Sequence, residues 1–283
     1  MAFDPAQYKT TTRQQWQEYA SGWNAWAPLL ETWLGPATDR MLDLAGVTAG
    51  SSVIDVAAGA GGQSIAAAHR AGPSGQVLAT DLSPEILRYA AKAAADAGMD
   101  NVSTRELDGE HLHDLDAGSF DAAISRVGFI YFPDRHRALT GIHHALADGG
   151  RFATITYSTA ATNQFFSLPV SIIRRRAELP APAPDQPGPF SFADPELVHR
   201  ELTTAGFHDI VVEVIDAPVH LPSAAECARF ERESFGALHQ MLASLSSEAQ
   251  RSVWAEIEEA LGQFESDRGF VGPCELVVAG ATR

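Results

Sequence analysis

The chain has 283 residues, of which 36 are acidic and 20 are basic, so its formal charge at pH 7 is −16. That length accommodates one large α/β domain, or a core domain with a smaller appendage. Proteins that neutralise phosphates normally carry a basic surface, so this charge balance disfavours nucleic acids and anionic membranes as partners.

The cysteines and the N-terminal residues exclude further classes. Cys227 and Cys274 are 47 positions apart, and neither belongs to a pair with metal-ligand spacing. We therefore expect neither a disulfide framework nor a metal site. The start of the chain lacks the charged segment and apolar core of a signal peptide, and no stretch approaches the roughly 18 apolar residues of a membrane helix. These features predict a soluble, cytoplasmic protein without membrane insertion.

Aromatic side chains are concentrated in residues 10–34. Tyr19, Trp23 and Trp26 follow Trp16 at spacings of three, seven and ten, which places them on one face of a helix. Such a helix either anchors itself on the domain through its large rings or closes as a lid over a ligand. The two roles are compatible, and we assign residues 1–36 to an N-terminal helical lid.

Strands and helices then alternate through residues 37–158, which we expect to form the ligand-binding core. Alternation of this kind predicts parallel strands with helices on both faces of a doubly wound sheet. The expected strands cover 51–57, 76–81, 102–107, 119–125 and 151–157, and the expected helices cover 37–46, 61–71, 83–98 and 133–150.

A proline-rich stretch, residues 159–193, interrupts the alternation and is expected to run over the surface as a lid or connector. Its prolines include Pro180, Pro182, Pro184, Pro187 and Pro189. Residues 194–283 are expected to complete the sheet with strands over 210–215 and 274–281, separated by a helical cap over about 222–268. The predicted fold class is therefore α/β, a doubly wound Rossmann-like sheet of seven strands.

A glycine-rich turn joins the first strand to the next helix. Gly59 and Gly61 allow a ligand to approach the backbone closely, as nucleotide-type sites require. The dinucleotide pattern Gly-x-Gly-x-x-Gly is incomplete, because Ser64 stands where the third glycine belongs. Asp55, inside the strand, would oppose a pyrophosphate but suits a ligand with an ammonium group, such as S-adenosylmethionine.

Two further acids end the next two strands. Asp81 offers two acceptor oxygens to a pair of vicinal ribose hydroxyls. Asp108, followed by Gly109, stands where an adenine amino group would lie. Ligands of open α/β sheets bind at the carboxyl ends of the strands. The three acids, in register with the glycines, predict S-adenosylmethionine as the cofactor.

The motifs, taken in order, resemble those of class I S-adenosylmethionine-dependent methyltransferases, and most of all the ubiquinone/menaquinone-type C-methyltransferases. The matching stretches are Val53–Gly61, Thr80–Glu85, Asp108–Glu110, Ser119–Asp121 and Leu146–Arg151. Ala57 departs from the family pattern, since many members have glycine there. The resemblance implies methyl transfer, with these cofactor-binding residues: Asp55, Ala57, Ala58, Gly59, Gly61, Asp81, Leu82, Asp108, Gly109, Glu110 and Arg126.

The methyl acceptor is harder to predict. The segment Ser125–Phe132 follows the fourth strand and is rich in aromatic residues, which favours a small, largely apolar aromatic or isoprenoid-like acceptor. Candidates for a general base are Tyr19, Tyr131 and His239, with His111, His113, His136 and Tyr157 as alternatives.

Several functions remain open at this stage. Methylation at carbon is favoured by the resemblance alone, and O- or N-methylation of a small natural product is the alternative. A protein that binds S-adenosylmethionine without transferring its methyl group is a further hypothesis. The incomplete glycine pattern disfavours a nicotinamide-dependent oxidoreductase. The expected partner is a small-molecule acceptor of secondary metabolism, and a homodimer is left open.

Overall fold

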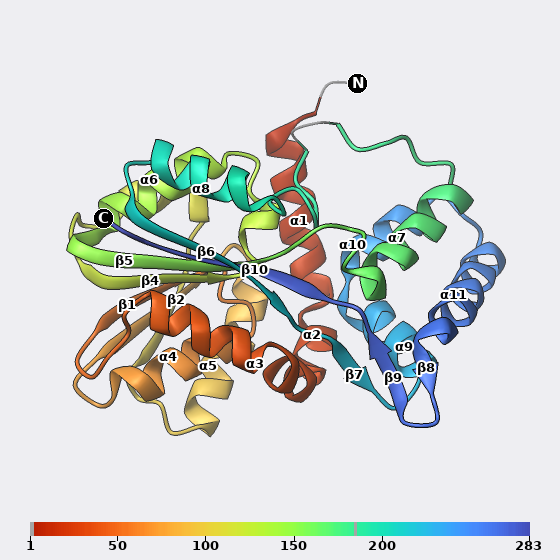
Figure 1. Ribbon diagram of the computed structural model, residues 1–283, viewed down its shortest axis with the longest axis horizontal. Coiled ribbons are helices and arrows are strands. Elements are labelled where there is room, and N and C mark those ends of the chain that lie inside the picture. The colour runs from red at the N-terminus through yellow and green to blue at the C-terminus, as the bar shows by residue number, and fades with distance from the viewer. Residues whose placement is uncertain (1–2, 184–185) are drawn as a thin grey trace.

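The computed structural model describes residues 3–183 and 186–283. At its centre is a seven-stranded sheet in the order β3-β2-β1-β4-β5-β10-β6 (Figure 1). β1 to β5 pair in parallel, whereas β10 runs antiparallel to both of its neighbours, β5 and β6. The predicted α/β, doubly wound fold class is thereby confirmed. Pro184, which belongs to the expected connector, lies outside the described residues.

The strands of this sheet agree with the expected ones to within a few residues at most ends. The largest difference is at the start of β5, where Leu146 already pairs with Phe120 before a register shift. The strand bounds are Ser52–Val56 (β1), Gln76–Asp81 (β2), Val102–Glu106 (β3), Phe120–Arg126 (β4), Leu146–Tyr157 (β5), His208–Asp216 (β6) and Glu275–Thr282 (β10).

Helices cover both faces of the sheet (Figure 1). One face carries α3 (Ala27–Leu44), α4 (Gly62–Ala71) and α5 (Pro84–Asp96), and the other carries α6 (Arg135–Ala145) and α8 (Pro195–Thr204). Each face therefore buries one of the two hydrophobic clusters of the protein.

The alternation of side chains along β1 shows how the sequence divides between these clusters. Val53 packs in the cluster beneath α3 and α4, while Ile54 and Val56 pack in the cluster on the α6 and α8 side. Because side chains two residues apart share a face of a strand, Asp55 is directed toward α4.

Three helices of the core begin at side-chain caps. Ser83 caps α5 and accepts a hydrogen bond from the Ile86 amide, with Pro84 in the first helical position. Asp134 caps α6 through the Arg137 amide at 2.9 Å, and Asp194 caps α8 through the Glu196 amide at 3.0 Å. These caps fix where each helix starts beside the strand ends.

The N-terminal region forms three helices. α1 (Pro5–Glu18) and α2 (Ala20–Ala25) are separated at Tyr19, and α3 follows after Trp26. The aromatic residues 16–26, expected on one face of a helix, are thus divided among α1, α2 and the junctions that follow them, and the expected short helix over 37–46 is part of the longer α3. α3 continues through Pro36, at the cost of one backbone donor.

A cap of helices lies beside one end of the sheet, with α1 standing between the two (Figure 1). It contains α7 (Gln164–Arg176), α9 (Ala224–Ser234), α10 (Gly236–Leu242) and α11 (Ser247–Leu261). α7 occupies the part of the expected lid or connector that precedes its proline run and ends at Arg176. None of the helices over the described residues has the length and apolarity needed to cross a membrane.

A second, three-stranded sheet accompanies the cap and was not predicted. It has the order β7-β9-β8, with β7 at Val219–Leu221, β9 at Gly269–Gly272 and β8 at Glu265–Ser266. Strands of two to four residues are too short to show a period-two pattern in the sequence. The small sheet joins β6 to the cap and the cap to β10.

Candidate functional site

A cavity of about 600 Å³ opens at the carboxyl ends of β1, β2 and β4, beneath α1, α2 and α3. Its volume is within the usual range for small-molecule sites. Predicted cofactor residues that line it are Ala57, Ala58, Gly59, Asp81, Leu82, Asp108, Gly109 and Arg126. Asp55, Gly61 and Glu110 lie behind the cavity wall and do not line it. The structure thus brings most of the predicted set together.

The glycine-rich turn has a strained backbone. Ala57 has a φ of 60°, in the left-handed region that favours glycine, and Gly59 and Gly61 have φ values of 57° and 87°. Gly61 is also required for packing, because a Cβ there would lie 2.9 Å from the Ala90 Cβ. Val127, at the end of β4, has a φ of 61°, which is rare for a β-branched residue. Two non-glycine residues with a left-handed backbone, Ala57 and Val127, therefore directly follow β1 and β4, the strands that flank the topological switch point.

Asp55 is completely buried on the α4 side of β1. Its carboxyl accepts hydrogen bonds from Ser64 Oγ at 2.5 Å and from Gln63 Nε2 at 3.3 Å. Burial raises the pKa of Asp55 to about 7, although these two bonds and the nearby Arg126 favour its charged form. Asp55 holds the start of α4 against β1 and does not line the cavity.

Asp81 points into the cavity from the end of β2. Its Oδ2 accepts from the Gly59 amide and its Oδ1 from the Ser83 amide, both at 3.0 Å. Burial raises the pKa of Asp81, while its backbone hydrogen bonds, including these two, lower it. Each oxygen has a further lone pair for a ligand hydroxyl, so Asp81 is oriented by the protein and still able to accept hydrogen bonds.

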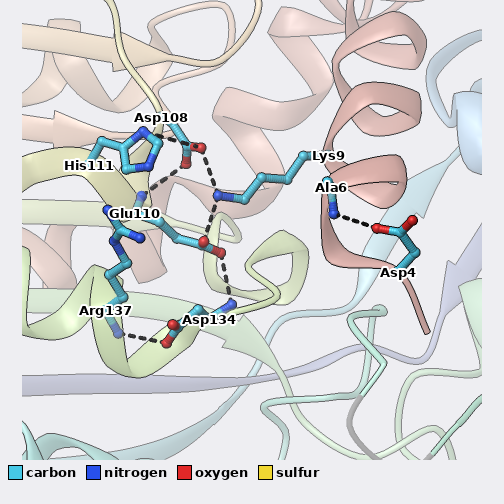
Figure 2. Close-up of polar contacts among 8 residues, drawn as sticks. All are labelled: Asp4, Ala6, Lys9, Asp108, Glu110, His111, Asp134 and Arg137. Carbon is cyan, nitrogen blue, oxygen red and sulfur yellow. Dashed lines mark hydrogen bonds and ion pairs between the residues drawn. The ribbon is translucent and has the colours of Figure 1, made fainter. Parts of the chain in front are cut away.

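Asp108 and Glu110 share a cation from the N-terminal helix (Figure 2). Lys9 Nζ lies 2.7 Å from Asp108 Oδ2 and 2.5 Å from Glu110 Oε2. Desolvation lowers the pKa of Lys9, but hydrogen bonds and charges of the two carboxylates outweigh it and the pKa is raised. The acid predicted at the adenine end is therefore already in contact with α1.

Arg126, at the end of β4, places a half-buried cation in the cavity wall. Its Nη1 donates to Thr38 Oγ1 at 3.0 Å, and among the described residues the guanidinium forms no ion pair. Burial lowers the pKa of Arg126 to about 10, against the raising effect of Asp55. A Cβ on Gly62 would lie 3.2 Å from Arg126 Nη2, so the guanidinium lies beside the glycine-rich turn. The guanidinium can therefore bind the carboxylate of a ligand.

Aromatic rings form the other half of the cavity. Trp16 packs edge-on against Trp23 and Tyr131, at centroid distances of 5.3 and 5.6 Å. Phe235 follows, 5.8 Å from Trp23 and 4.7 Å from Phe166. Burial raises the pKa of Tyr131 above its ordinary value, so its hydroxyl stays protonated at neutral pH. This wall suits an apolar, ring-containing molecule.

Two of the three candidate bases lie elsewhere. Tyr19 stacks on His239 with a centroid distance of 4.9 Å, and neither side chain lines the cavity. His239 Nε2 lies 2.5 Å from the Arg232 carbonyl oxygen of α9. Tyr131 and the alternative Tyr157 do line the cavity, whereas His111, His113 and His136 are exposed and do not.

Sequence reasoning missed Lys9, Thr38 and Phe235 as cavity residues. A signal for Lys9 was present, because Lys9, Trp16 and Trp23 follow one another at intervals of seven and all three line the cavity. Nothing in the sequence pointed to Thr38 or Phe235. Both cysteines are buried and free, and the described ranges contain no cluster of metal-ligating side chains.

The sheet with its antiparallel β10, and the cavity at its switch point, have the arrangement of the class I methyltransferase fold. Residues 48–184 match the family model described as a methyltransferase domain, which confirms the resemblance seen in the motifs. An uncharacterized protein of Mycobacterium tuberculosis is 35% identical over 178 residues, which cover 62% of this chain and 60% of that protein. The chain therefore matches about three fifths of this relative's length.

Two named methyltransferases are also similar. Aklanonic acid methyltransferase DauC of a Streptomyces species is 31% identical over 118 residues, covering 42% of this chain and 53% of that protein. The solved structure of Haemonchus contortus phosphoethanolamine N-methyltransferase 2, in complex with phosphomonomethylethanolamine and S-adenosylhomocysteine, superposes with a TM-score of 0.57. It is 19% identical and covers 92% of this chain and 57% of that one, a likeness of fold.

Proposed function

We propose that this protein is an S-adenosylmethionine-dependent methyltransferase acting on a small, largely apolar aromatic or isoprenoid-like metabolite. The observation that carries the proposal is the division of one cavity into two chemically different halves. One half presents backbone amides, Asp81, Asp108 and Arg126, and the other presents aromatic rings. A polar nucleoside with an amino acid end suits the first half, and an apolar acceptor suits the second.

The polar half fits each part of S-adenosylmethionine with a separate group. Arg126 is a half-buried cation without an ion-pair partner among the described residues, and a ligand carboxylate would supply one. Asp81 has spare lone pairs for both ribose hydroxyls. Leu82, Asp108 and Gly109 would hold the adenine. When bound, the cofactor supplies a methyl group on a positively charged sulfur.

The acceptor half supports the proposed substrate class. Trp16, Trp23, Tyr131, Phe166 and Phe235 give it flat, apolar surfaces, which favour rings or isoprenoid chains over sugars or phosphates. The likeness to a methyltransferase of aklanonic acid supports a small natural product as the acceptor. Carbon is our first choice for the methylated atom, with oxygen or nitrogen as the alternative. The acidic chain supports a free small molecule over nucleic acid, and we propose a cytoplasmic location.

Alignment supplies most of the catalysis in this proposal. Holding an acceptor atom in line with the methyl group can contribute on the order of 7 to 11 kcal/mol. Tyr131 and Tyr157 line the cavity, and burial raises the pKa of both. We therefore assign them to hydrogen-bond donation that orients the acceptor, rather than to proton abstraction at neutral pH.

A binding experiment tests the cofactor assignment first. Thermal unfolding of the full chain is followed with S-adenosylmethionine, S-adenosylhomocysteine and NAD, since a ligand at about 100 times its Kd stabilises by roughly 2.7 kcal/mol. The first two ligands should raise the Tm, and Asp81→Asn and Arg126→Met should each reduce that rise. A rise with NAD alone would overturn the proposal.

A transfer experiment then tests the activity. The protein is incubated with methyl-labelled S-adenosylmethionine and a panel of phenols, quinols, indoles, polyketides and prenyl compounds. Label in a product, located by mass spectrometry on carbon, oxygen or nitrogen, supports transfer and identifies the methylated atom. Cofactor binding without label in any acceptor of a broad panel would favour the non-transferring hypothesis.

A further inference from the structure

Lys9 completes a polar network that belongs to the core of the protein. Asp108 Oδ1 accepts from the Glu110 amide at 3.0 Å, and Glu110 Oε1 accepts from the Asp134 amide at 2.8 Å (Figure 2). Each carboxylate is thus fixed through one oxygen, and the other oxygen of each is bound by Lys9 Nζ. The two acids would repel each other if α1 left and took Lys9 with it.

These three side chains are largely shielded from water. The exposed fractions of the Lys9, Asp108 and Glu110 side chains are 22%, 16% and 6%. Ion pairs at such sites are screened less than surface pairs, and loss of one partner leaves a charge that is poorly solvated. The lysine therefore holds α1 to the core more firmly than an exposed contact would.

The same helix forms a wall of the cavity. Lys9, Thr12 and Trp16 of α1 all line it, and Trp16 packs on Tyr131. Arg13 makes a second ion pair with Glu106, at the end of β3. Lys9 and Arg13 consequently link α1 to the adenine end of the site, and the ring of Trp16 links it to the acceptor end.

We infer that Lys9 is a positioning residue that couples the closure of α1 to occupancy of the cofactor site. The inference rests on the proposed function and adds a residue and a sequence of events to it. Lys9 releases Asp108 and Glu110 when α1 opens to admit the cofactor, and binds them again when α1 closes over it. Closure also brings Trp16 to the acceptor wall, so the acceptor half is complete only while the cofactor is enclosed.

The test measures release of S-adenosylhomocysteine from the full chain by stopped-flow displacement. Lys9→Met removes the cation and keeps a long apolar side chain, and Lys9→Arg keeps the cation. Lys92→Met is the matched control, because Lys92 forms an exposed pair with Asp96 on α5 and neither of these two residues lines the cavity. We expect release about tenfold faster in Lys9→Met, equivalent to about 1.4 kcal/mol, and rates near that of the native protein in Lys9→Arg and Lys92→Met.

Salt provides a second readout that a purely structural role would not change. Raising the ionic strength should accelerate release from the native protein, and the acceleration should be smaller in Lys9→Met, in which only the exposed Arg13–Glu106 pair still links α1 to the core by charge. Equal release rates in the native protein and Lys9→Met would overturn the inference and leave the proposed function intact. Absence of S-adenosylhomocysteine binding in the native protein would overturn the proposed function itself.

Hydrogen exchange keeps the inference testable if Lys9→Met folds poorly. In the native protein, S-adenosylhomocysteine should slow exchange of the amides in Pro5–Glu18 more than in α11, which lies in the cap. Glu110→Gln, which retains Lys9 and weakens one half of the network, should reduce that protection. Unchanged exchange in α1 on ligand binding would contradict the coupling.

Discussion

Ser64 donates a hydrogen bond to Asp55 Oδ2 at 2.5 Å, and both side chains are completely buried. Ser64 occupies the position of the third glycine in the dinucleotide pattern, so this bond gives the departure from that pattern a structural reason. The serine joins the start of α4 to the strand before the turn. A glycine there would leave an oxygen of a buried carboxylate without this partner, which is costly.

The pH dependence of folding should report the environment of Asp55. Burial raises its pKa from 3.8 to about 7, so the folded protein retains a proton that the unfolded chain releases in this interval. Stability from this group is complete below about pH 3.8 and is lost as the pH rises toward 7. Asp55→Asn should flatten the pH profile of the unfolding free energy there, by up to roughly 1.4 kcal/mol per pH unit.

Urea denaturation at several pH values measures this effect. Asp148→Asn is the control, because Asp148 is fully exposed. A profile for Asp55→Asn that is as steep as that of the native protein would show that Asp55 ionises normally in the folded state.

The left-handed backbone of Ala57 predicts that a substitution at this position stabilises the protein. An alanine in this region costs on the order of 1 to 2 kcal/mol relative to its preferred conformations. Ala57→Gly should therefore raise the unfolding free energy by up to about 1 kcal/mol after the entropic cost of glycine, and should retain cofactor binding. Gly59→Ala, at a φ of 57°, should do the reverse. Chemical denaturation of the two variants checks both signs, and a destabilised Ala57→Gly would refute the strain.

A buried carboxyl in the cap offers a stabilising substitution. Glu231 is completely buried on α9, and neither of its oxygens has a hydrogen-bond partner in the structure. Burial raises its pKa well above 4.5, so its contribution to stability falls as the pH rises beyond that value. Glu231→Leu should raise the unfolding free energy by about 1 to 3 kcal/mol, and more at pH 8 than at pH 5. Denaturation at the two pH values measures the difference; a destabilised variant at pH 8 would indicate that the carboxyl has a partner in solution.

Tyr131 should contribute modestly to turnover. Because burial raises its pKa, its phenol serves as a donor, and Tyr131→Phe should lower kcat by less than about tenfold. A general base would contribute 10²–10⁴-fold, so a loss of that size would restore Tyr131 as the base. Tyr19→Phe and His239→Ala are informative companions, since both side chains lie outside the cavity and their loss should leave kcat within about twofold.

The cofactor half of the site was accessible to sequence reasoning, and the acceptor half largely was not. Asp81 and Asp108 could be placed because a parallel α/β sheet brings its strand ends to one edge. Asp55 was placed correctly on its strand, but the period-two alternation that turns it toward α4 was not used. Phe235 and Thr38 line the cavity because helices that are distant in the sequence pack beside one another. No short-range sequence pattern predicts such packing. The position of His239 outside the cavity has the same cause.

Three rings of the acceptor wall, Trp16, Trp23 and Phe235, lie outside residues 48–184, the stretch that matches the methyltransferase family model. If the proposed function holds, the choice of acceptor depends on α1, α2 and the α9–α10 junction, while the sheet and its turn serve the cofactor. For protein engineers, the helices that flank the core are the segments to diversify when a new acceptor is sought.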